Sequence, residues 1–226
     1  TIHNIHVWVN AAVATCAFWL REQELLDWTI QGEFGWEQQL EKGVNDDGLW
    51  WEGAIGYHFY TFQALSSLAM TASDAGICLW EKDRFRKMLQ APLSLAYDDC
   101  WKGQLSGFAK SYELGSMVWP EDGFDVQLSR IYQNARPDGY QSWTCTVAQP
   151  FKTPATHVRN STNALLFGVD SLPPTEPRKQ SSRLFKASGI GVLENDSVRI
   201  CMRAGPYGGY HDHRDKLNVD VVASNG

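Results

Sequence analysis

The sequence predicts a protein of the α+β class, with helices in its first part and strands in its last. Apolar residues recur at helical spacing from the start of the chain, as Ile5, Trp8 and Ala12 do. After residue 181 the pattern changes to short alternating runs, which are typical of strands. A proline-rich stretch at residues 172–177 separates the two patterns and has the composition of a linker.

These patterns divide the chain into a helical domain over residues 1–170, a linker over 171–180 and a strand domain over 181–226. Paired helices of similar length favour an (α/α) array over a compact bundle. In chain order, we expect a helix at about 4–26 and a short helical run that ends at 43. Further helices are expected at 60–69, 82–95, 108–119, 124–132 and 162–167. We expect strands at 182–187, 189–194, 198–203 and 217–222, with a hairpin turn at Asn195-Asp196.

The composition limits the possible functions. The chain has 226 residues, 43% of them hydrophobic, which is enough for a sizeable core. Its net charge of −6 argues against general nucleic-acid binding, which needs a basic face. The ten tryptophans fit either a large core or a groove that stacks on sugar rings. No stretch is apolar over the length that a transmembrane helix needs.

The two ends of the sequence suggest a fragment. The first residue, Thr1, lies just before a predicted helix, and the last residues follow a predicted strand directly. We therefore expect a piece of a longer protein, in which localisation signals are missing from this chain.

A loop rich in aromatic residues and glycines lies at residues 45–60. It begins with an Asn-Asp-Asp-Gly turn and leads into a helix. Because sugar sites combine ring stacking with polar hydrogen bonds, the loop is a candidate saccharide-binding rim. Its polar and aromatic candidates are Glu52, Tyr57, His58 and Tyr60. The alternative is a tightly packed loop between helices, with Phe59 and Tyr60 in the core.

A second candidate is the stretch Gly205–Leu217, which places ionisable residues behind a glycine-rich turn. On an extended strand, His211, His213 and Asp215 would point to the same face. Imidazole and carboxylate groups suit zinc, and a neutral histidine also suits general base catalysis. The alternative is a charged, solvated strand edge.

Three blocks of the sequence resemble the heparinase II/III-like polysaccharide lyases, a family that includes the oligo-alginate lyases. The blocks are Asn4–Ala12, Asp47–Tyr60 and Gly205–Leu217, the last of which reads Gly-Pro-x-Gly-Gly-x-His-x-His-x-Asp-Lys-Leu. The resemblance implies an incomplete (α/α) toroid followed by an antiparallel β-sheet domain of the β-sandwich kind, here truncated. It also implies β-elimination at a uronic acid, which leaves a C4=C5 double bond.

The resemblance also implies roles for individual residues. Asn4 would neutralise the substrate carboxylate, while Tyr57 and His211 would transfer protons. A free tyrosine has a pKa of about 10, so a tyrosine base needs nearby positive charge, for which His211, Arg203 and Arg214 are candidates. The expected substrate-binding residues are His6, Trp50, Glu52, His58, Tyr60 and Arg214.

The same resemblance implies a structural zinc ion with His213 as one ligand, at a site that this chain would hold only in part. The expected partner is an acidic polysaccharide or oligosaccharide, with no nucleic acid and no membrane segment. The expected location is periplasmic or secreted.

Three other functions stay open. An (α/α)-toroid glycoside hydrolase would use two carboxylates, drawn from Asp46, Asp47 and Glu52. A zinc hydrolase would use His211, His213 and Asp215. A non-catalytic saccharide-binding protein of the same fold would bind without turnover.

Overall fold

The computed structural model of the chain describes residues 1–95, 108–133, 162–174, 181–205 and 217–223. The chain forms two compact units, of which the first combines Thr1–Leu95 with Gln180–Gly226 and the second is Ala96–Lys179. The described elements are helices and one four-stranded antiparallel sheet, in agreement with the predicted α+β class. The domain boundaries expected from the sequence, and the toroid and sandwich architectures, stay predictions.

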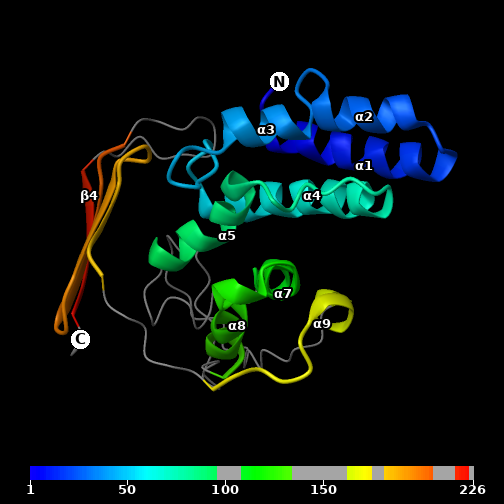
Figure 1. The fold of residues 1–226 in the computed structure, drawn as a ribbon. Coiled ribbons are helices and arrows are strands. Elements are labelled where there is room, and N and C mark those ends of the chain that lie inside the picture. The colour runs from blue at the N-terminus through cyan, green and yellow to red at the C-terminus, as the bar shows by residue number, and fades with distance from the viewer. Residues whose placement is uncertain (96–107, 134–161, 175–180, 206–216, 224–226) are drawn as a thin grey trace, which may run out of the picture. The chain divides into compact units, whose positions relative to one another are not determined.

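The first unit is built on two helices that run in the same direction, α1 (Asn4–Leu20) and α4 (Ile55–Asp74) (Figure 1). Near their starts, the ring centroids of Trp8 and Tyr60 are 5.2 Å apart. Farther along, Thr15 Oγ1 lies 3.3 Å from Thr71 Oγ1. Both helices therefore present their N-termini at the same end of the pair.

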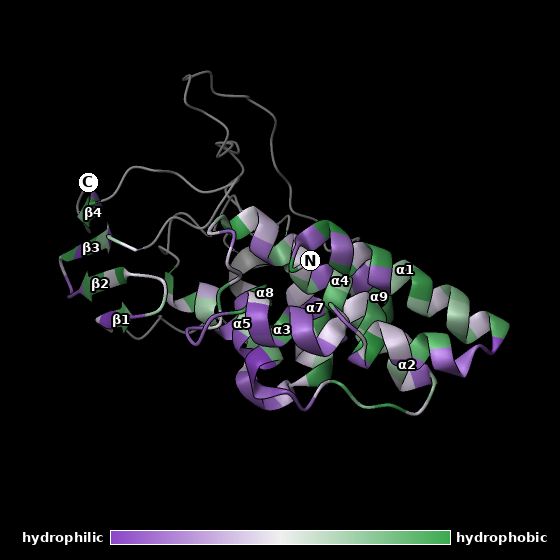
Figure 2. Ribbon diagram, turned by 90° about the horizontal axis from the view of Figure 1, so that it is seen from above, coloured by the Kyte–Doolittle hydropathy of each residue, from purple (hydrophilic) through white to green (hydrophobic). Residues whose placement is uncertain are grey.

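Helices α2 (Gln23–Gln31) and α3 (Trp36–Gly43) bring the chain back along α1. Arg21 ends α1 in the left-handed conformation, with φ of 60°. The return is complete at Gln39, whose Nε2 donates to the Thr1 carbonyl at 2.8 Å and whose Oε1 accepts from His3 N at 3.1 Å. Most of α1 is hydrophobic, whereas α3 is largely hydrophilic (Figure 2). Only one face of α1 is buried, however, and its apolar residues Ile5, Val9, Trp19 and Leu20 are exposed.

The amphipathic helix expected at residues 82–95 is present as α5 (Asp83–Leu95). It buries Phe85, Met88 and Leu89. The ring of Phe85 meets Trp36 of α3 edge to face at 5.3 Å, and Phe62 of α4 at 5.1 Å. These aromatic contacts join α3, α4 and α5 in one core.

The second unit contains α7 (Ala109–Val118), the 3-10 turn η2 (Pro120–Asp122), α8 (Phe124–Gln133) and α9 (Thr162–Phe167). Tyr112 and Phe124 are fully buried in it, with ring centroids 5.7 Å apart. Burial raises the pKa of Tyr112 well above its ordinary value. Asn163 Nδ2 donates to the carbonyl of Lys110 at 3.1 Å and ties α9 to α7.

The sheet has the order β1 (Arg183–Phe185), β2 (Ile190–Glu194), β3 (Val198–Arg203) and β4 (Asn218–Ala223), with every pair antiparallel. The expected hairpin turn between β2 and β3 is confirmed, since Asn195 Oδ1 accepts from Ser197 N and Val198 N at 2.9 Å each.

The two faces of the sheet differ. Phe185 and Val192 are buried on the inner face and form a small core with Leu49 and Ala91 of the helical segment. The outer face carries exposed apolar side chains, namely Leu184, Leu193, Met202, Val219 and Val221.

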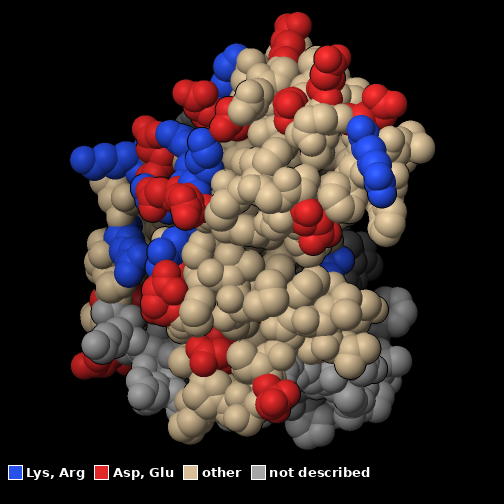
Figure 3. Space-filling view, turned by 45° about the vertical axis from the view of Figure 1, so that its right-hand side comes forward, with Lys and Arg blue, Asp and Glu red and all other residues tan. Residues whose placement is uncertain are grey.

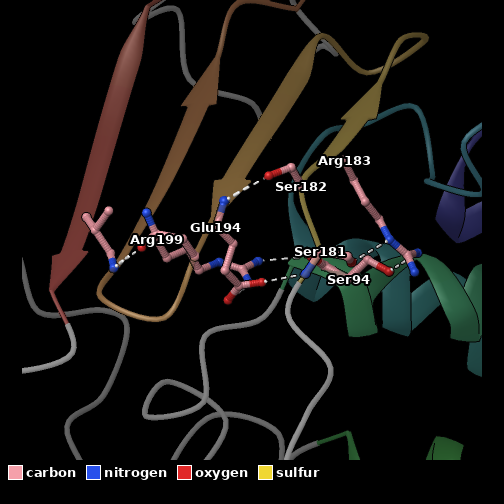
Figure 4. A network of polar contacts seen from close by, with 8 residues as sticks. Ser94, Ser181, Ser182, Arg183, Glu194 and Arg199 are labelled. Carbon is pink, nitrogen blue, oxygen red and sulfur yellow. Dashed lines mark hydrogen bonds and ion pairs between the residues drawn. The ribbon is translucent and has the colours of Figure 1, made fainter.

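A polar network fastens the inner face to the end of α5 (Figure 4). Arg199 and Glu194 form an ion pair with N···O of 2.9 Å in which both side chains are only 6% exposed. Arg199 Nη2 also donates to the Ser94 carbonyl at 2.9 Å, and Arg183 Nη1 donates to Ser94 Oγ. Because carbonyls at a helix C-terminus lack intrahelical donors, Arg199 supplies a donor to the carbonyl of Ser94.

In the ranges that the structure describes, no helix has both the length and the apolarity that crossing a membrane requires.

Candidate functional site

The aromatic loop expected at residues 45–60 is a loop only over residues 44–54, because α4 begins at Ile55. From here on, the aromatic loop means residues 44–54, which lie at the end of the first unit where α1 and α4 begin. Its predicted turn is confirmed, because Asn45 Oδ1 accepts from Asp47 N at 3.1 Å and from Leu49 N at 3.0 Å. Gly48 has φ of 88°, and a Cβ there would lie 2.7 Å from the Lys87 carbonyl oxygen. The close approach to α5 therefore requires glycine.

Glu52 is the polar centre of this loop and is 1% exposed. Its Oε2 accepts from Asn4 Nδ2 and from Trp50 Nε1, each at 2.6 Å. Its Oε1 lies 4.0 Å from Nε2 of His3. A buried carboxylate is costly unless it has donors, and these contacts supply them. Glu52 thus joins the loop to the first residue of α1.

Asn4 occupies the first turn of α1, directly after the N-cap His3, whose Nδ1 accepts from Ile5 N at 3.2 Å. The Asn4 side chain is 1% exposed. Its Oδ1 is buried and has no hydrogen-bond partner among the described residues. An unpaired buried oxygen is unusual and is often found where a function needs it.

The side chains of Trp50, in the loop, and of His58, in the first turn of α4, are both buried. Trp50 N donates to His58 Nδ1 at 3.0 Å. His58 Nε2 lies 2.7 Å from the Met88 carbonyl oxygen, and only the tautomer with a proton on Nε2 can donate to it. Burial lowers the pKa of His58 to about 4, and the hydrogen bond to Met88 opposes this shift only in part. His58 is therefore neutral at pH 7, with both ring nitrogens engaged.

Tyr57 and Tyr60 lie on the side of α4 that faces α1. Their ring centroids are 6.4 Å apart in an edge-to-face arrangement, and Tyr60 also packs on Trp8. Tyr57 is half-buried and Tyr60 is 39% exposed. The indole N–H of Trp8 has no hydrogen-bond partner among the described residues. A phenol, a second phenol and an indole donor thus gather where the two parallel helices begin.

The structure brings some of the predicted residues together and separates others. Asn4, Glu52 and Trp50 are in direct contact, and Trp50 contacts His58. His6 lies apart from this group and packs edge to face on Phe34 at 6.0 Å. Partial burial is the largest cause that lowers the pKa of His6. The predicted residues outside the described ranges are His211, His213, Arg214 and Asp215.

Sequence reasoning did not assign Trp8 or Ser188 to this region. Trp8 fits the apolar period of α1, which predicts a core residue. Ser188 precedes β2 and is far from the loop in sequence, yet its Oγ accepts from Asn45 Nδ2 at 2.9 Å and its N donates to Asp47 Oδ2 at 2.8 Å. No local pattern could have revealed this long-range contact.

The described residues do not test the predicted zinc site. No group of three His, Cys, Asp or Glu side chains within the described ranges is placed to hold a metal ion. The histidine assigned to zinc, His213, lies outside those ranges.

Charged side chains of both signs share the surface in Figure 3, with uncharged areas between them. On the face that the figure shows, the coloured Lys and Arg side chains do not form a continuous basic surface.

Comparison with known proteins gives one family match. Residues 1–98 match the family model described as Alginate lyase. No curated protein matches the chain. The matched range includes Asn4, Glu52 and Tyr57, so the helices and loop of the candidate site lie in the part of the chain that resembles the alginate lyase family. This match supports a lyase that acts on a polysaccharide.

Proposed function

We propose that the protein is a polysaccharide lyase that cleaves a uronic-acid-containing acidic polysaccharide by β-elimination. The observation that carries the proposal is the family match over residues 1–98, which contain the start of α1, the aromatic loop and the start of α4. The buried contact between Asn4 and Glu52 and the neighbouring tyrosines supply side chains that suit this chemistry.

Elimination at a uronate removes the proton at C5 and expels the oxygen linked to C4. It needs a group that stabilises the charge that develops on the carboxylate, a base for the C5 proton and an acid for the leaving oxygen. In this proposal, Asn4 donates to the substrate carboxylate, and Tyr57 and His211 share the two proton transfers.

The environment of Asn4 adds a condition to this proposal. An amide has two N–H donors, and one of those of Asn4 is directed at Glu52. Because Asn4 is 1% exposed, direct contact with substrate requires residues 44–54 to move aside when the polymer binds. Before that movement, Glu52 holds the amide in one orientation.

The other predicted residues have supporting places in the proposal. Tyr60, which is partly exposed, would contact the sugar. Trp50 and His58, which are buried, would stabilise the conformation of the loop. His6 and Arg214 stay expected substrate contacts.

The finer features of the proposal follow from the resemblance to the heparinase II/III-like family. They are the (α/α) toroid, the β-sandwich, a structural zinc ion bound by His213 in the whole protein, and a periplasmic or secreted location. No step of the reaction above depends on the zinc ion.

The test measures ultraviolet absorbance of the C4=C5 product while the full-length protein acts on a panel of uronate polymers. We expect absorbance to rise with at least one polymer. The Tyr57→Phe variant should lose roughly 10²–10⁴-fold in rate, the usual contribution of general acid–base catalysis. The comparison variant is Tyr60→Phe, which removes a neighbouring phenol hydroxyl but retains the ring that contacts the sugar, and it should lose much less rate than Tyr57→Phe.

Other outcomes would replace the proposal. New reducing ends without absorbance would indicate a glycoside hydrolase. Saturable binding of sugar without either signal would indicate a saccharide-binding protein. Equal rates for Tyr57→Phe and Tyr60→Phe would exclude Tyr57 from the chemistry.

A further inference from the structure

A cavity of about 350 Å³ lies on the side of the aromatic loop that faces the sheet. Its walls come from the loop, the first turn of α4, the end of α5, the residues before β2 and the end of β3, all within the first compact unit. The residues that matter for its chemistry are Trp51, Ala54, Ile55, Leu95, Ile190 and Arg203. A volume of this size is at the lower end of the range of roughly 300–1,000 Å³ for ligand sites and suits one sugar ring.

Arg203 gives this cavity its charge. It is the charged side chain among the described residues that line the cavity, and no carboxylate is among them. Arg203 lies on the inner face of β3, next to the partner residues Ile190 and Asn218. A guanidinium carries five N–H donors, so it can bond to the protein and to a ligand at the same time, and its planar fork matches a carboxylate.

The polar side chains of Asn45, Ser188 and His58 in the wall are engaged with the protein. Asn45 and Ser188 bond to each other, and both ring nitrogens of His58 have backbone partners. The first turn of α4 adds a weaker positive contribution, because its N-cap, Ala54, provides no side-chain hydrogen bond to the helix. Arg203 is therefore the main candidate for binding an anion in the cavity.

Trp51 supplies an aromatic wall. It is half-buried and lines the cavity. A sugar ring stacked on an indole is stabilised by contact between the two apolar faces. A cationic fork and an indole across a small apolar cavity suit a ring that carries one carboxylate.

The cavity is next to Tyr57 but separate from it. Ile55 and His58 line the cavity, whereas Tyr57, between them in sequence, packs with Tyr60 toward α1. A polymer that crosses the start of α4 can therefore place one sugar at Tyr57 and the adjoining sugar in the cavity.

We propose that this cavity binds the uronate residue adjacent to the one that reacts, with Arg203 paired to its carboxylate and Trp51 stacked on its ring. The inference rests on the proposed function, because it names a subsite for the same polymer. It predicts a preference for chains with consecutive uronates.

The experiment measures binding by calorimetry in the Tyr57→Phe background of the full-length protein, where turnover is slow. The ligands are a saturated mannuronate tetrasaccharide and mannotetraose, which has the same linkage and no carboxylates. We expect Arg203→Gln to weaken binding of the acidic ligand by about tenfold or more and to leave binding of mannotetraose unchanged. The matched control is Arg183→Gln, on the same sheet but outside the cavity, which should bind as the parent does.

A second variant tests the aromatic wall. Trp51→Ala should weaken both ligands, whereas Trp51→Phe should retain most of the binding. Equal binding of the acidic ligand by the parent and Arg203→Gln, or no binding of it by the parent, would overturn the inference. If wild type produces no ultraviolet absorbance but binding still depends on Arg203, the lyase proposal fails and this site stands.

Discussion

At the scale of single residues, the buried polar side chains around residues 44–54 have complementary partners. Glu52 accepts two short hydrogen bonds, and His58 bridges the loop and α5. Such groups cost several kcal/mol when they are buried alone, so their partners are as important as their own identity. Changing either one should alter the shape of the loop as well as its chemistry.

The neutral state of His58 makes stability depend on pH. Its pKa is about 4 in the folded protein, against 6.5 for a free histidine. Between these values the unfolded chain binds a proton that the folded chain does not, so stability falls as the pH is lowered from about 6.5 to about 4. The expected loss is on the order of 3 kcal/mol.

The measurement for His58 is the free energy of unfolding of the first unit as a function of pH, for wild type and His58→Gln. Glutamine provides an acceptor and a donor but does not titrate in this range. The difference in stability between the two proteins should change across the pH window. A constant difference from pH 7 to pH 4 would show that His58 does not titrate as expected.

A further residue-scale prediction concerns Glu52. Glu52→Ala removes the acceptor of both Asn4 Nδ2 and Trp50 Nε1, at a cost of roughly 1–3 kcal/mol for each buried donor left unpaired. Glu52→Gln retains an acceptor oxygen and should lose less. Near-ultraviolet circular dichroism of the tryptophans and thermal unfolding would measure both effects. Equal losses in the two variants would point to side-chain volume instead of hydrogen bonding.

At the scale of elements, the apolar period of the sequence predicted α5 and β2 well, because these elements have one buried face. It predicted one helix over residues 4–26, where the chain forms α1 and α2. The break occurs at Arg21, which adopts φ of 60° without a glycine to signal it. Side-chain type alone does not reveal such a turn.

The candidate site was predicted only in part for a similar reason. The aromatic loop was identified from its residue types, but the burial of Trp50 and His58 depends on α5, and the contact with Ser188 depends on the sheet. Contacts between distant segments leave no local periodic pattern in one sequence. The sequence therefore identified candidate residues of the site, but it did not show which of them are exposed to solvent.

The start of β2 and the end of β3 provide an element-scale prediction. Gly189 has φ of 63°, and a Cβ there would lie 2.2 Å from the Cα of Gly205. Gly189→Ala should destabilise the sheet by more than about 2 kcal/mol, because both the conformation and the contact exclude a methyl group. Gly191→Ala is the matched control, since a Cβ at that position of β2 meets nothing within 4 Å. Chemical denaturation followed by circular dichroism would compare them, and equal stabilities would contradict the expectation.

At the scale of the whole molecule, the first compact unit is discontinuous in sequence and the second is inserted into it. The sheet is fastened to the helical segment by its small inner core and by the network around Ser94. Within that network the ion pair of Arg199 and Glu194 is almost fully buried. Removing one partner of a buried pair leaves an uncompensated charge, which costs more than the pair itself contributes.

Glu194→Ala should therefore destabilise the attachment of the sheet by roughly 3 kcal/mol. Glu194→Gln, which retains an oxygen for the Arg199 guanidinium, should lose less. Hydrogen exchange of amides in β2 and β3, compared with amides in α4, would measure the effect, and the strand amides should lose protection first. Equal loss of protection in α4 and in the strands would show that the unit unfolds as a whole.

The bonds from Ser188 to Asn45 and Asp47 join residues that are 143 and 141 positions apart. During synthesis, α1 and α4 can pair as soon as residues 1–74 have emerged, since that contact closes a much shorter loop. The aromatic loop gains its contact with Ser188 only after the whole inserted unit has been made. The candidate site is therefore expected to be among the last parts of the first unit to form, so a slow or misfolded insert would delay activity without touching a residue of the site.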